Sequence, residues 1–382
     1  MLSSEQKELY DLAFRIGKDL IEPQAARWDA EKAFPWPIHE VASKQDWYGL
    51  TFPEEHGGLG RPILEFAILL EAIGASSACG ATMGLIETHS LGAQPIVIAG
   101  NSDQKSAWLP GIASGESLCA FSITEPETGS DVGSMSARAV RSDQGYVINA
   151  RKVFCTLGNM ARFITVFAKV PGVQRGGGIT AFVVDTEQAQ GLSVGRIEKK
   201  MGLRGNPTVE LMFDDVVVPE VHRLGEEGEG FRIAMETLLK GRVAVAADSV
   251  GVMQYVLKYA KDYSDTRTQF GKPIGELQGI AFKLADMDIA CETARQATYN
   301  AARSLDEPTD GRTRARLTAI AKCYATDVRL RVVSDALQIL GGYGYMEDHP
   351  LERIYRDSRI YPIFEGTNEI QRVVISRALS AL

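Results

Sequence analysis

The spacing of apolar residues divides the chain into three stretches. Up to about residue 115, apolar positions recur with the period of a helix, as in "LEFAILLEAIGASSACGATMGL", and the turn-rich "FPEEHGGLGRP" interrupts them. From about 116 to 225, short runs rich in β-branched residues alternate with Gly, Pro and Asp turns, which predicts antiparallel strands. Helical periodicity returns from about 226.

The last stretch contains three long helical patterns, at about 229–262, 276–304 and 313–340, the third ending at Gly341-Gly342. A helix, strand, helix order without an alternating βαβ rhythm argues against a doubly wound nucleotide-binding fold. We therefore expect an α+β, mainly helical protein: an N-terminal helical domain (1–115), a middle antiparallel β-barrel domain (116–225) and a C-terminal helical bundle (226–382).

The N-terminus has the pattern of a helix that begins almost at once. Ser3 and Gln6 have the spacing of a capping box, and a helical stripe of apolar residues follows at Leu9, Leu12, Ala13, Ile16 and Leu20. No basic segment precedes an apolar run, so a secretory signal is not expected. No stretch of eighteen or more apolar residues predicts a membrane span.

Charge and composition narrow the class of partner. The 382 residues carry a formal net charge of -8, with a pI near 5.4, which disfavours nucleic acid and anionic membranes. Five scattered cysteines predict reduced thiols, in a bacterial cytoplasm or a matrix-like compartment. The isolated histidines predict no metal site. "GGGITA" (176–181) fits GxGxxA but precedes a strand, so a turn is expected there.

One carboxylate has unusual neighbours. In "IYPIFEGTNEIQR" (360–372), apolar residues lead directly into Glu365, and Gly366 then allows close approach of the backbone. An unpaired buried Glu is rare, so this residue is either a solvated turn residue or a buried acid with a function.

Five segments require a joint explanation: "FSITEPETGSDVGS" (121–134), "KVFCTLGN" (152–159), "DTRTQFGKPIGELQ" (265–278), "QILGGYGY" (338–345) and "YRDSRIYPIFEGTNEIQR" (355–372). In this order, on a chain of this length, they resemble the acyl-CoA dehydrogenase family of flavoenzymes, most closely its medium-chain and short-chain branch. The resemblance extends from about residue 5 to the C-terminus. It implies bound FAD, an acyl-CoA substrate, electron-transfer flavoprotein as acceptor and a homotetramer.

The resemblance makes Glu365 the catalytic base. Dehydrogenation across Cα and Cβ of a thioester needs a base for the α-proton while the β-hydrogen leaves as hydride to flavin N5. Apolar neighbours such as Phe364 would raise the pKa of this carboxyl. Some relatives place the base just before an Arg on a long helix, where this chain has Gly241, so Glu365 has no competitor. Arg242 matches the family arginine near the catalytic carboxylate.

The resemblance also assigns the cofactor and substrate positions. Phe154 departs from the Trp of many relatives, at the flavin edge that faces the acceptor. FAD contacts are expected from Ile123, Thr124, Phe154, Thr156, Arg267, Thr268, Phe270, Gln338, Gly341, Gly342, Thr367 and Glu369, with Arg267, Thr268 and Phe270 reaching across a subunit boundary. Substrate contacts are expected from Phe121, Ser130, Glu87, Arg242 and Gly366, with Glu87 at the floor of the acyl pocket.

Several alternatives stay open at this point. A dicarboxylic acyl group is disfavoured, because Thr82 stands where such relatives carry an Arg. An acyl-CoA oxidase and an enoyl-CoA reductase of the same fold fit the same residues, and a non-catalytic binding module would have lost the base or the flavin motifs. One sequence does not fix chain length, branching or cyclic character of the acyl group, nor the physiological direction and acceptor.

Overall fold

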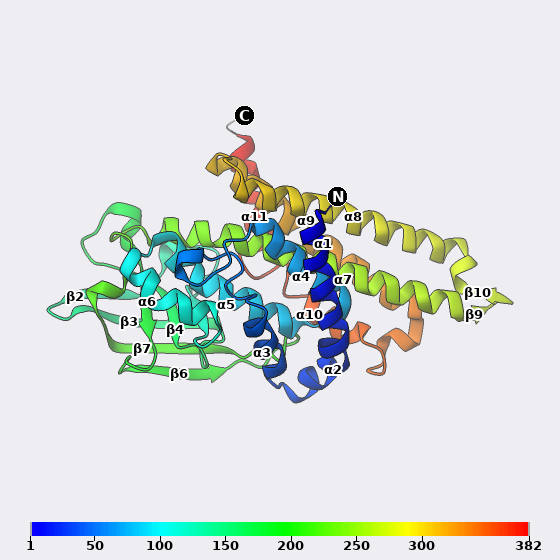
Figure 1. Cartoon of the computed structure of the whole chain (residues 1–382), viewed down its shortest axis with the longest axis horizontal. Coiled ribbons are helices and arrows are strands. Elements are labelled where there is room, and N and C mark those ends of the chain that lie inside the picture. The colour runs from blue at the N-terminus through cyan, green and yellow to red at the C-terminus, as the bar shows by residue number, and fades with distance from the viewer. Residues whose placement is uncertain (1, 381–382) are drawn as a thin grey trace.

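The computed structural model describes residues 2–380, with the β-sheet at one end of an elongated molecule and a helical hairpin at the other (Figure 1). The N-terminal stretch forms helices α1 (Ser4–Ile16), α2 (Glu22–Glu31), α3 (Trp36–Lys44), α4 (Ile63–Ser77), α5 (Gly80–Ala99) and α6 (Ser102–Ala113). The predicted capping box is confirmed, since Gln6 N donates to Ser3 Oγ at 3.2 Å and Ser3 N donates to Gln6 Oε1 at 3.1 Å.

The middle stretch folds into an eight-stranded sheet with the order β6-β7-β3-β2-β4-β5-β8, and β1 pairs with β4. Its strands are β1 (Cys119–Ser122), β2 (Arg138–Ser142), β3 (Gly145–Thr156), β4 (Phe163–Lys169), β5 (Ile179–Asp185), β6 (Leu192–Ile197), β7 (Thr208–Val218) and β8 (Arg223–Leu224). The glycines of "GGGITA" form the turn before β5, as expected.

Two details of the middle domain differ from expectation. β1 pairs with β4 in parallel, as does β2 at Arg138, so the sheet is not purely antiparallel. Among the described residues, β6 and β8 end the sheet without pairing to each other, so the predicted closed barrel is not found. The alternation of apolar residues fixes which face of a strand is buried but not which strand becomes its neighbour.

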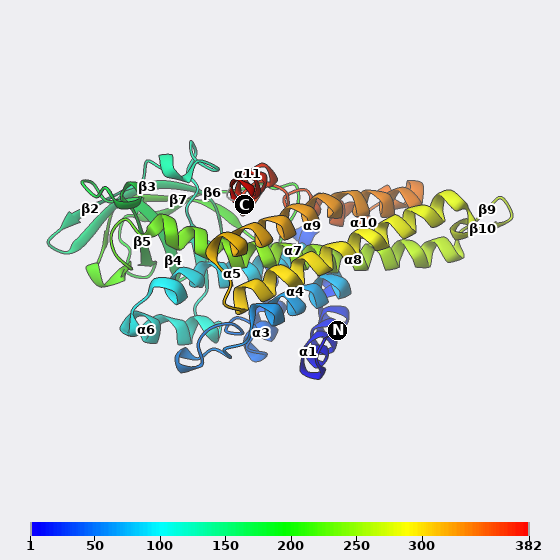
Figure 2. The same cartoon turned by 90° about the horizontal axis from the view of Figure 1, so that it is seen from above.

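The C-terminal stretch forms α7 (Gly230–Thr266), α8 (Gln278–Asp306), α9 (Gly311–Leu340), α10 (Leu351–Ser358) and α11 (Asn368–Leu379). The three long predicted helices are confirmed to within a few residues, and α9 ends before Gly341, whose φ is 61°. A short hairpin, β9 (Thr268–Gln269) and β10 (Lys272–Pro273), joins α7 to α8 at the far end of the bundle (Figure 2).

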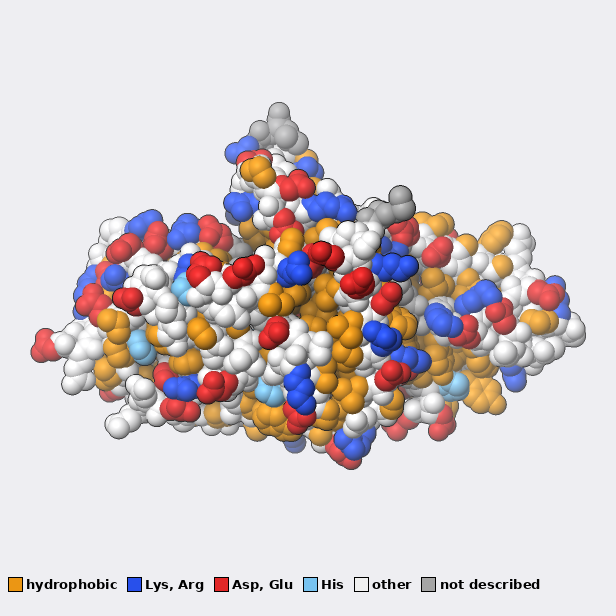
Figure 3. Space-filling model, in the orientation of Figure 1, with side chains coloured by type: hydrophobic (Ala, Val, Ile, Leu, Met, Phe, Trp, Pro, Cys, Tyr) orange, Lys and Arg blue, Asp and Glu red, His pale blue; other side chains and the backbone are white. Residues whose placement is uncertain are grey.

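Helix α7 is the central element of the fold, because it packs against α4, α5, α8 and α9. Close packing depends on Gly251, where an added Cβ would lie 2.2 Å from the carbonyl oxygen of Glu71 on α4. Positive and negative side chains are interspersed over the face in Figure 3, and hydrophobic side chains gather near its centre. No helix among residues 2–380 combines the length and apolar character needed to cross a membrane.

We predict that Gly251→Ala lowers the free energy of unfolding by about 1–3 kcal/mol, because the new methyl group overlaps the backbone of α4. Gly279→Ala on α8 is the matched control, since nothing lies within 4 Å of a Cβ at that position. Urea unfolding followed by circular dichroism measures both variants. Equal stability of the two would contradict close packing of α7 on α4.

Candidate active site

The loop that carries Glu365 joins α10 to α11 and has a constrained backbone. Glu365 has a φ of 53°, in the left-handed region that residues other than glycine rarely adopt. Tyr361 is fully buried before it, and the ring of Phe364 lies 5.0 Å from the Tyr361 ring. Such a conformation persists only where surrounding contacts impose it.

Lys322 on α9 and two polar side chains of α11 hold the loop beyond Glu365. Lys322 Nζ donates to the carbonyl oxygen of Gly366 at 3.0 Å and to Asn368 Oδ1 at 2.9 Å. Gln371 Nε2 donates to the same carbonyl at 2.8 Å. Because two donors bind the carbonyl oxygen of Gly366, the backbone directly after Glu365 is held in place.

Arg329 on α9 fixes the segment that precedes Glu365. Its guanidinium carbon lies 3.5 Å from the centre of the Tyr361 ring. Arg329 Nη1 donates to Asp248 Oδ2 on α7 at 2.7 Å, and Nε donates to Ser358 Oγ at 2.9 Å. This buried ion pair joins α7, α9 and the loop, and removal of either partner would leave a buried charge uncompensated.

The carboxyl group of Glu365 packs directly on α7 at Gly241. A Cβ added at Gly241 would lie 2.0 Å from Glu365 Oε2 and 2.9 Å from Cδ. A side chain at position 241 and the observed position of the carboxyl group therefore exclude each other. A base carried on α7 would need a side chain at position 241. In this chain the carboxyl group of Glu365 occupies that space.

Glu87 on α5 is the carboxyl partner of Glu365. Burial raises the pKa of Glu365 above its ordinary value, against the opposing effects of Glu87, Lys322 and Arg242. Burial and the charge of Glu365 raise the pKa of Glu87 well above its ordinary value. The charge of Glu365 therefore opposes ionisation of Glu87.

Buried cations surround this pair. Burial lowers the pKa of Arg242 to about 10 and that of Lys322 to about 8, and the charge of Glu365 opposes both shifts. Burial also lowers the pKa of Lys240 to about 7, opposed by the charge of Glu87. Arg242 Nε and Glu365 Oε2 are buried without a hydrogen-bond partner among residues 2–380. Each atom could therefore still form a hydrogen bond.

The segments that carry the expected flavin contacts meet beside strand β3. Val153 N donates to the carbonyl oxygen of Thr124 at 2.9 Å, which places Thr124 beside β3. The buried Lys152 donates to the carbonyl oxygen of Ile123 at 3.1 Å and to Glu125 Oε1 at 2.8 Å. The loop after β1 and strand β3 are thereby fixed together.

Phe154 projects out of the sheet because the backbone of β3 is irregular there. The register of β3 with β7 shifts between Lys152 and Cys155, and Phe154 has a φ of 58° and is 64% exposed. Two residues on, Thr156 Oγ1 lies 3.2 Å from Thr208 Oγ1. The bulge presents an aromatic ring next to a pair of hydroxyl groups.

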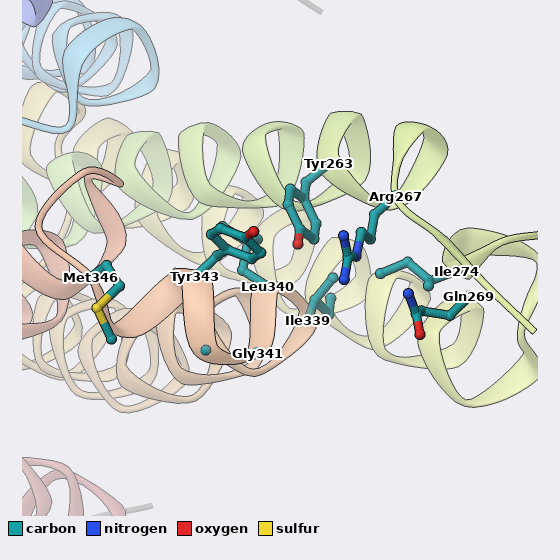
Figure 4. Close-up of a pocket in the computed structure, with 10 residues that line it drawn as sticks. Tyr263, Arg267, Gln269, Ile274, Ile339, Leu340, Gly341, Tyr343 and Met346 are labelled. Atoms are coloured by element: carbon teal, nitrogen blue, oxygen red, sulfur yellow. The ribbon is translucent and has the colours of Figure 1, made fainter.

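A second group of expected cofactor residues lines a cavity of about 600 Å³ beside the hairpin end of the bundle (Figure 4). Arg267 lies there with Gly341 and Gly342, and its guanidinium carbon is 5.8 Å from the centre of the Tyr343 ring. Nothing lies within 4 Å of a Cβ at either glycine, so a ligand has open access to this backbone. An arginine beside an uncovered helix-end backbone suits a diphosphate.

Five further expected cofactor residues lie at the end of α9, on the β9–β10 hairpin and at the start of α11. Gln338 is exposed in the last turn of α9, and Thr268 opens the hairpin. Phe270 at the hairpin tip is 90% exposed and contributes nothing to the core of its own chain. Thr367 caps α11 by accepting from Ile370 N at 3.3 Å, and Glu369 is exposed in the first turn of that helix.

The expected substrate residues differ in their exposure. Glu87 is 3% exposed on α5, and Phe121 on β1 is half-buried, its ring 5.1 Å from that of Phe167. Ser130 is exposed in the loop between β1 and β2. Thr82, also on α5, is fully buried, and its hydroxyl has no hydrogen-bond partner among residues 2–380.

Family models match almost the whole chain. Their descriptions are "Acyl-CoA dehydrogenase, N-terminal domain" at residues 3–116, "middle domain" at 120–216 and "C-terminal domain" at 228–380. The chain belongs to the acyl-CoA dehydrogenase family. It therefore has the three-domain fold of that family, mainly helical with a central sheet.

Named relatives extend over the same length. An acyl-CoA dehydrogenase of Bacillus subtilis is 39% identical over 378 residues, 99% of this chain and 98% of the relative. The caffeyl-CoA reductase-Etf complex subunit CarC of Acetobacterium woodii is 38% identical, covering 91% of this chain and 90% of the relative. The structure of butyryl-CoA dehydrogenase from Megasphaera elsdenii is 37% identical, with a TM-score of 0.94 over 100% of this chain and 99% of that chain.

Apart from Arg242, the sequence did not single out the buried cations at and near this site. Lys240, Lys322, Lys152 and Arg329 are all buried, and none was expected to take part. Their signal is a basic residue inside an apolar helical or strand pattern, as in "LLKGRVAVA" and "TAIAKCYAT". A cation is placed at such a position only where buried acceptors compensate it.

The raised pKa of Glu87 predicts a particular dependence of stability on pH. Because the folded chain holds this proton more tightly than the unfolded chain, stability is lost as pH rises from about 4.5 toward the folded pKa. Glu87→Gln removes this loss, so its Tm should fall less than that of the unmodified protein as the pH rises above about 4.5. Parallel Tm curves for the two proteins would contradict a buried protonated Glu87.

Proposed function

We propose that this chain is an FAD-dependent acyl-CoA dehydrogenase that forms a 2-enoyl-CoA, with Glu365 as the base that removes the α-proton of the thioester. The observation that carries this proposal is the buried carboxyl group of Glu365, packed on Gly241 and held by a constrained loop. When bound, the flavin supplies the acceptor for the hydride that leaves Cβ.

The surroundings of Glu365 suit a base that takes a proton from carbon. Burial raises its pKa, which makes the carboxylate a stronger base than in water. Arg242 and Lys322 favour the ionised form of Glu365, because their charges oppose that rise in its pKa. Tyr361 and Phe364 pack together in the apolar segment just before this residue. The backbone N–H of Glu365 itself then provides a donor for the thioester oxygen as negative charge develops.

The residues on and beside strand β3 fit a flavin ring. Ile123 and Thr124 on one segment, and Phe154 and Thr156 on the other, offer apolar surface and hydroxyl groups side by side. Lys152 and Glu125 hold the two segments together, which preorganises the surface before a cofactor binds. A planar ring with polar edges needs this combination of features.

The cavity beside Arg267 lies at the opposite end of the molecule from the β-sheet, so one chain cannot surround a whole dinucleotide with both groups of residues (Figure 1). A second copy that presents Arg267, Gly341 and Gly342 to the first resolves this separation. Exposed aromatic side chains on the same arm, Phe270 at 90% and Phe282 at 61%, favour a covered surface there. We therefore propose a homotetramer with FAD bound between subunits.

Thr367 and Glu369 complete the proposed cofactor contacts, and Phe121, Ser130, Glu87 and Gly366 the proposed substrate contacts. The name of the Acetobacterium woodii relative includes an Etf complex, which supports electron-transfer flavoprotein as the partner of this chain. A cytoplasmic or matrix-like location fits such a partner. Because that same relative is named a reductase, operation as an enoyl-CoA reductase is the second candidate function.

We predict that Glu365→Gln retains FAD and CoA-ester binding but loses about 10²–10⁴-fold in the rate of flavin bleaching by butyryl-CoA. The amide keeps the shape of the side chain and removes the base. Glu236→Gln is the control, since this carboxylate is half-exposed on α7 and pairs with Arg232 at 3.0 Å. Anaerobic stopped-flow absorbance measures both variants, and near-normal bleaching by Glu365→Gln would remove Glu365 as base.

A separate prediction concerns the cofactor. Arg267→Met removes the positive charge from the 600 Å³ cavity, so we expect FAD to bind at least about tenfold more weakly, through loss of a charge-assisted hydrogen bond. Lys261→Met is the control, because Lys261 pairs with Asp265 on the exposed side of α7. FAD release followed by fluorescence measures the change, and unaltered affinity would exclude the cavity as a cofactor site.

A further inference from the structure

Lys152 is a buried cation in the middle domain to which the proposed chemistry gives no part. It lies on β3, two residues before Phe154, and its side chain has no exposed surface. The preceding residue of the strand, Arg151, is exposed. A lysine that is fully removed from water requires specific acceptors for its ammonium group.

The first acceptor is the carboxylate of Glu125, which is itself fixed by other donors. Lys152 Nζ donates to Glu125 Oε1 at 2.8 Å, and Ala137 N donates to the same oxygen at 3.0 Å. Ser136 donates to Oε2 from its backbone N–H at 2.6 Å and from its hydroxyl at 2.7 Å. The carboxylate therefore holds the ammonium group in one place.

The second acceptor is the carbonyl oxygen of Ile123, at 3.1 Å from Lys152 Nζ. This carbonyl belongs to the peptide that joins Ile123 to Thr124. The described peptides are all trans, and in a trans peptide the N–H points away from the C=O. The Thr124 N–H is therefore directed away from Lys152, and within residues 2–380 it has no hydrogen-bond acceptor.

This free N–H lies at the flavin site proposed beside β3. Thr124 is half-buried, and its own carbonyl accepts from Val153 N at 2.9 Å, next to Phe154. A donor in this position suits an acceptor on the polar edge of a flavin ring. Hydrogen bonds in series polarise one another, so an ammonium group on the Ile123 carbonyl makes the Thr124 N–H a stronger donor.

We propose that Lys152 is a positioning residue that fixes and polarises the Ile123–Thr124 peptide, so that the Thr124 N–H raises the two-electron reduction potential of the bound flavin. Reduction adds negative charge to the ring, and a stronger donor stabilises that charge. The inference rests on the flavin site proposed above. It does not depend on Glu365 being the base.

A merely structural role for Lys152 predicts a different result. If the lysine only joined the loop after β1 to β3, its loss would weaken binding of oxidised and reduced FAD equally, and the potential would not change. A polarised donor favours reduced FAD over oxidised FAD. The reduction potential therefore separates the two roles, whereas activity does not.

The test is an anaerobic dithionite titration of the FAD-loaded protein against a reference dye, followed by absorbance. For Lys152→Met we expect a potential that is about 30 mV more negative, which corresponds to about tenfold in the equilibrium constant for two electrons. Lys152→Arg, which keeps the charge, should recover at least part of this shift. Arg151→Met is the matched control, because it removes an exposed cation of β3 that pairs with Glu210.

A second variant protects the test against misfolding. Lys152→Met leaves the buried Glu125 without its cation, which is destabilising in itself. The double variant Lys152→Met with Glu125→Gln removes both charges, and we expect its potential to shift in the same direction by less. Raman spectra of the flavin carbonyl stretches in both variants should move to higher frequency, as for a weakened hydrogen bond.

The outcomes distinguish this inference from the proposed function. A more negative potential with shifted carbonyl bands supports the role of Lys152, even if Glu365→Gln still bleaches with butyryl-CoA. An unchanged potential in every FAD-loaded variant overturns that role, even if the unmodified protein is an active dehydrogenase. An equal shift in Arg151→Met would also overturn it, since the effect would then be one of general charge.

Discussion

The carboxyl group of Glu365 lies where a side chain of residue 241 would otherwise lie, and most features of the site follow from this exclusion. A Cβ at Gly241 would approach Oε2 to 2.0 Å, so the acid can reach α7 only because the helix has no side chain there. The loop must also adopt a φ of 53° at Glu365 to direct the group inward. Arg329, Lys322 and Tyr361 supply the contacts that impose this conformation.

Burial of an acid at this point disfavours its ionised form, and charged groups on the neighbouring helices offset this effect in part. Desolvation alone would keep Glu365 neutral and useless as a base, whereas full compensation by an ion pair would make it too weak a base. Arg242 and Lys322 compensate it in part, and the raised pKa of Glu87 disfavours a second negative charge beside it. Partial compensation leaves Glu365 more basic than a carboxylate in water while still favouring its ionised form.

Much of the fold is readable from the sequence, because helical periods and caps are local. The capping box at Ser3, the long helices and the end of α9 before Gly341 follow from spacing alone. The parallel pairing of β1 with β4 does not, since alternation says nothing about neighbours. The family motifs brought out Glu365 and Arg242, but the closeness of Glu87 to Glu365 and the buried state of Lys240 depend on how α5 packs on α7, which no local pattern encodes.

The most direct test of Glu365 as base is exchange of the α-protons of butyryl-CoA with solvent deuterium, followed by NMR under anaerobic conditions. This exchange needs only proton removal and return at Cα, so it isolates the base from every later step. We expect the unmodified holoenzyme to exchange the α-protons and Glu365→Gln to leave them in place. Exchange at the same rate in both proteins would show that another group removes the proton.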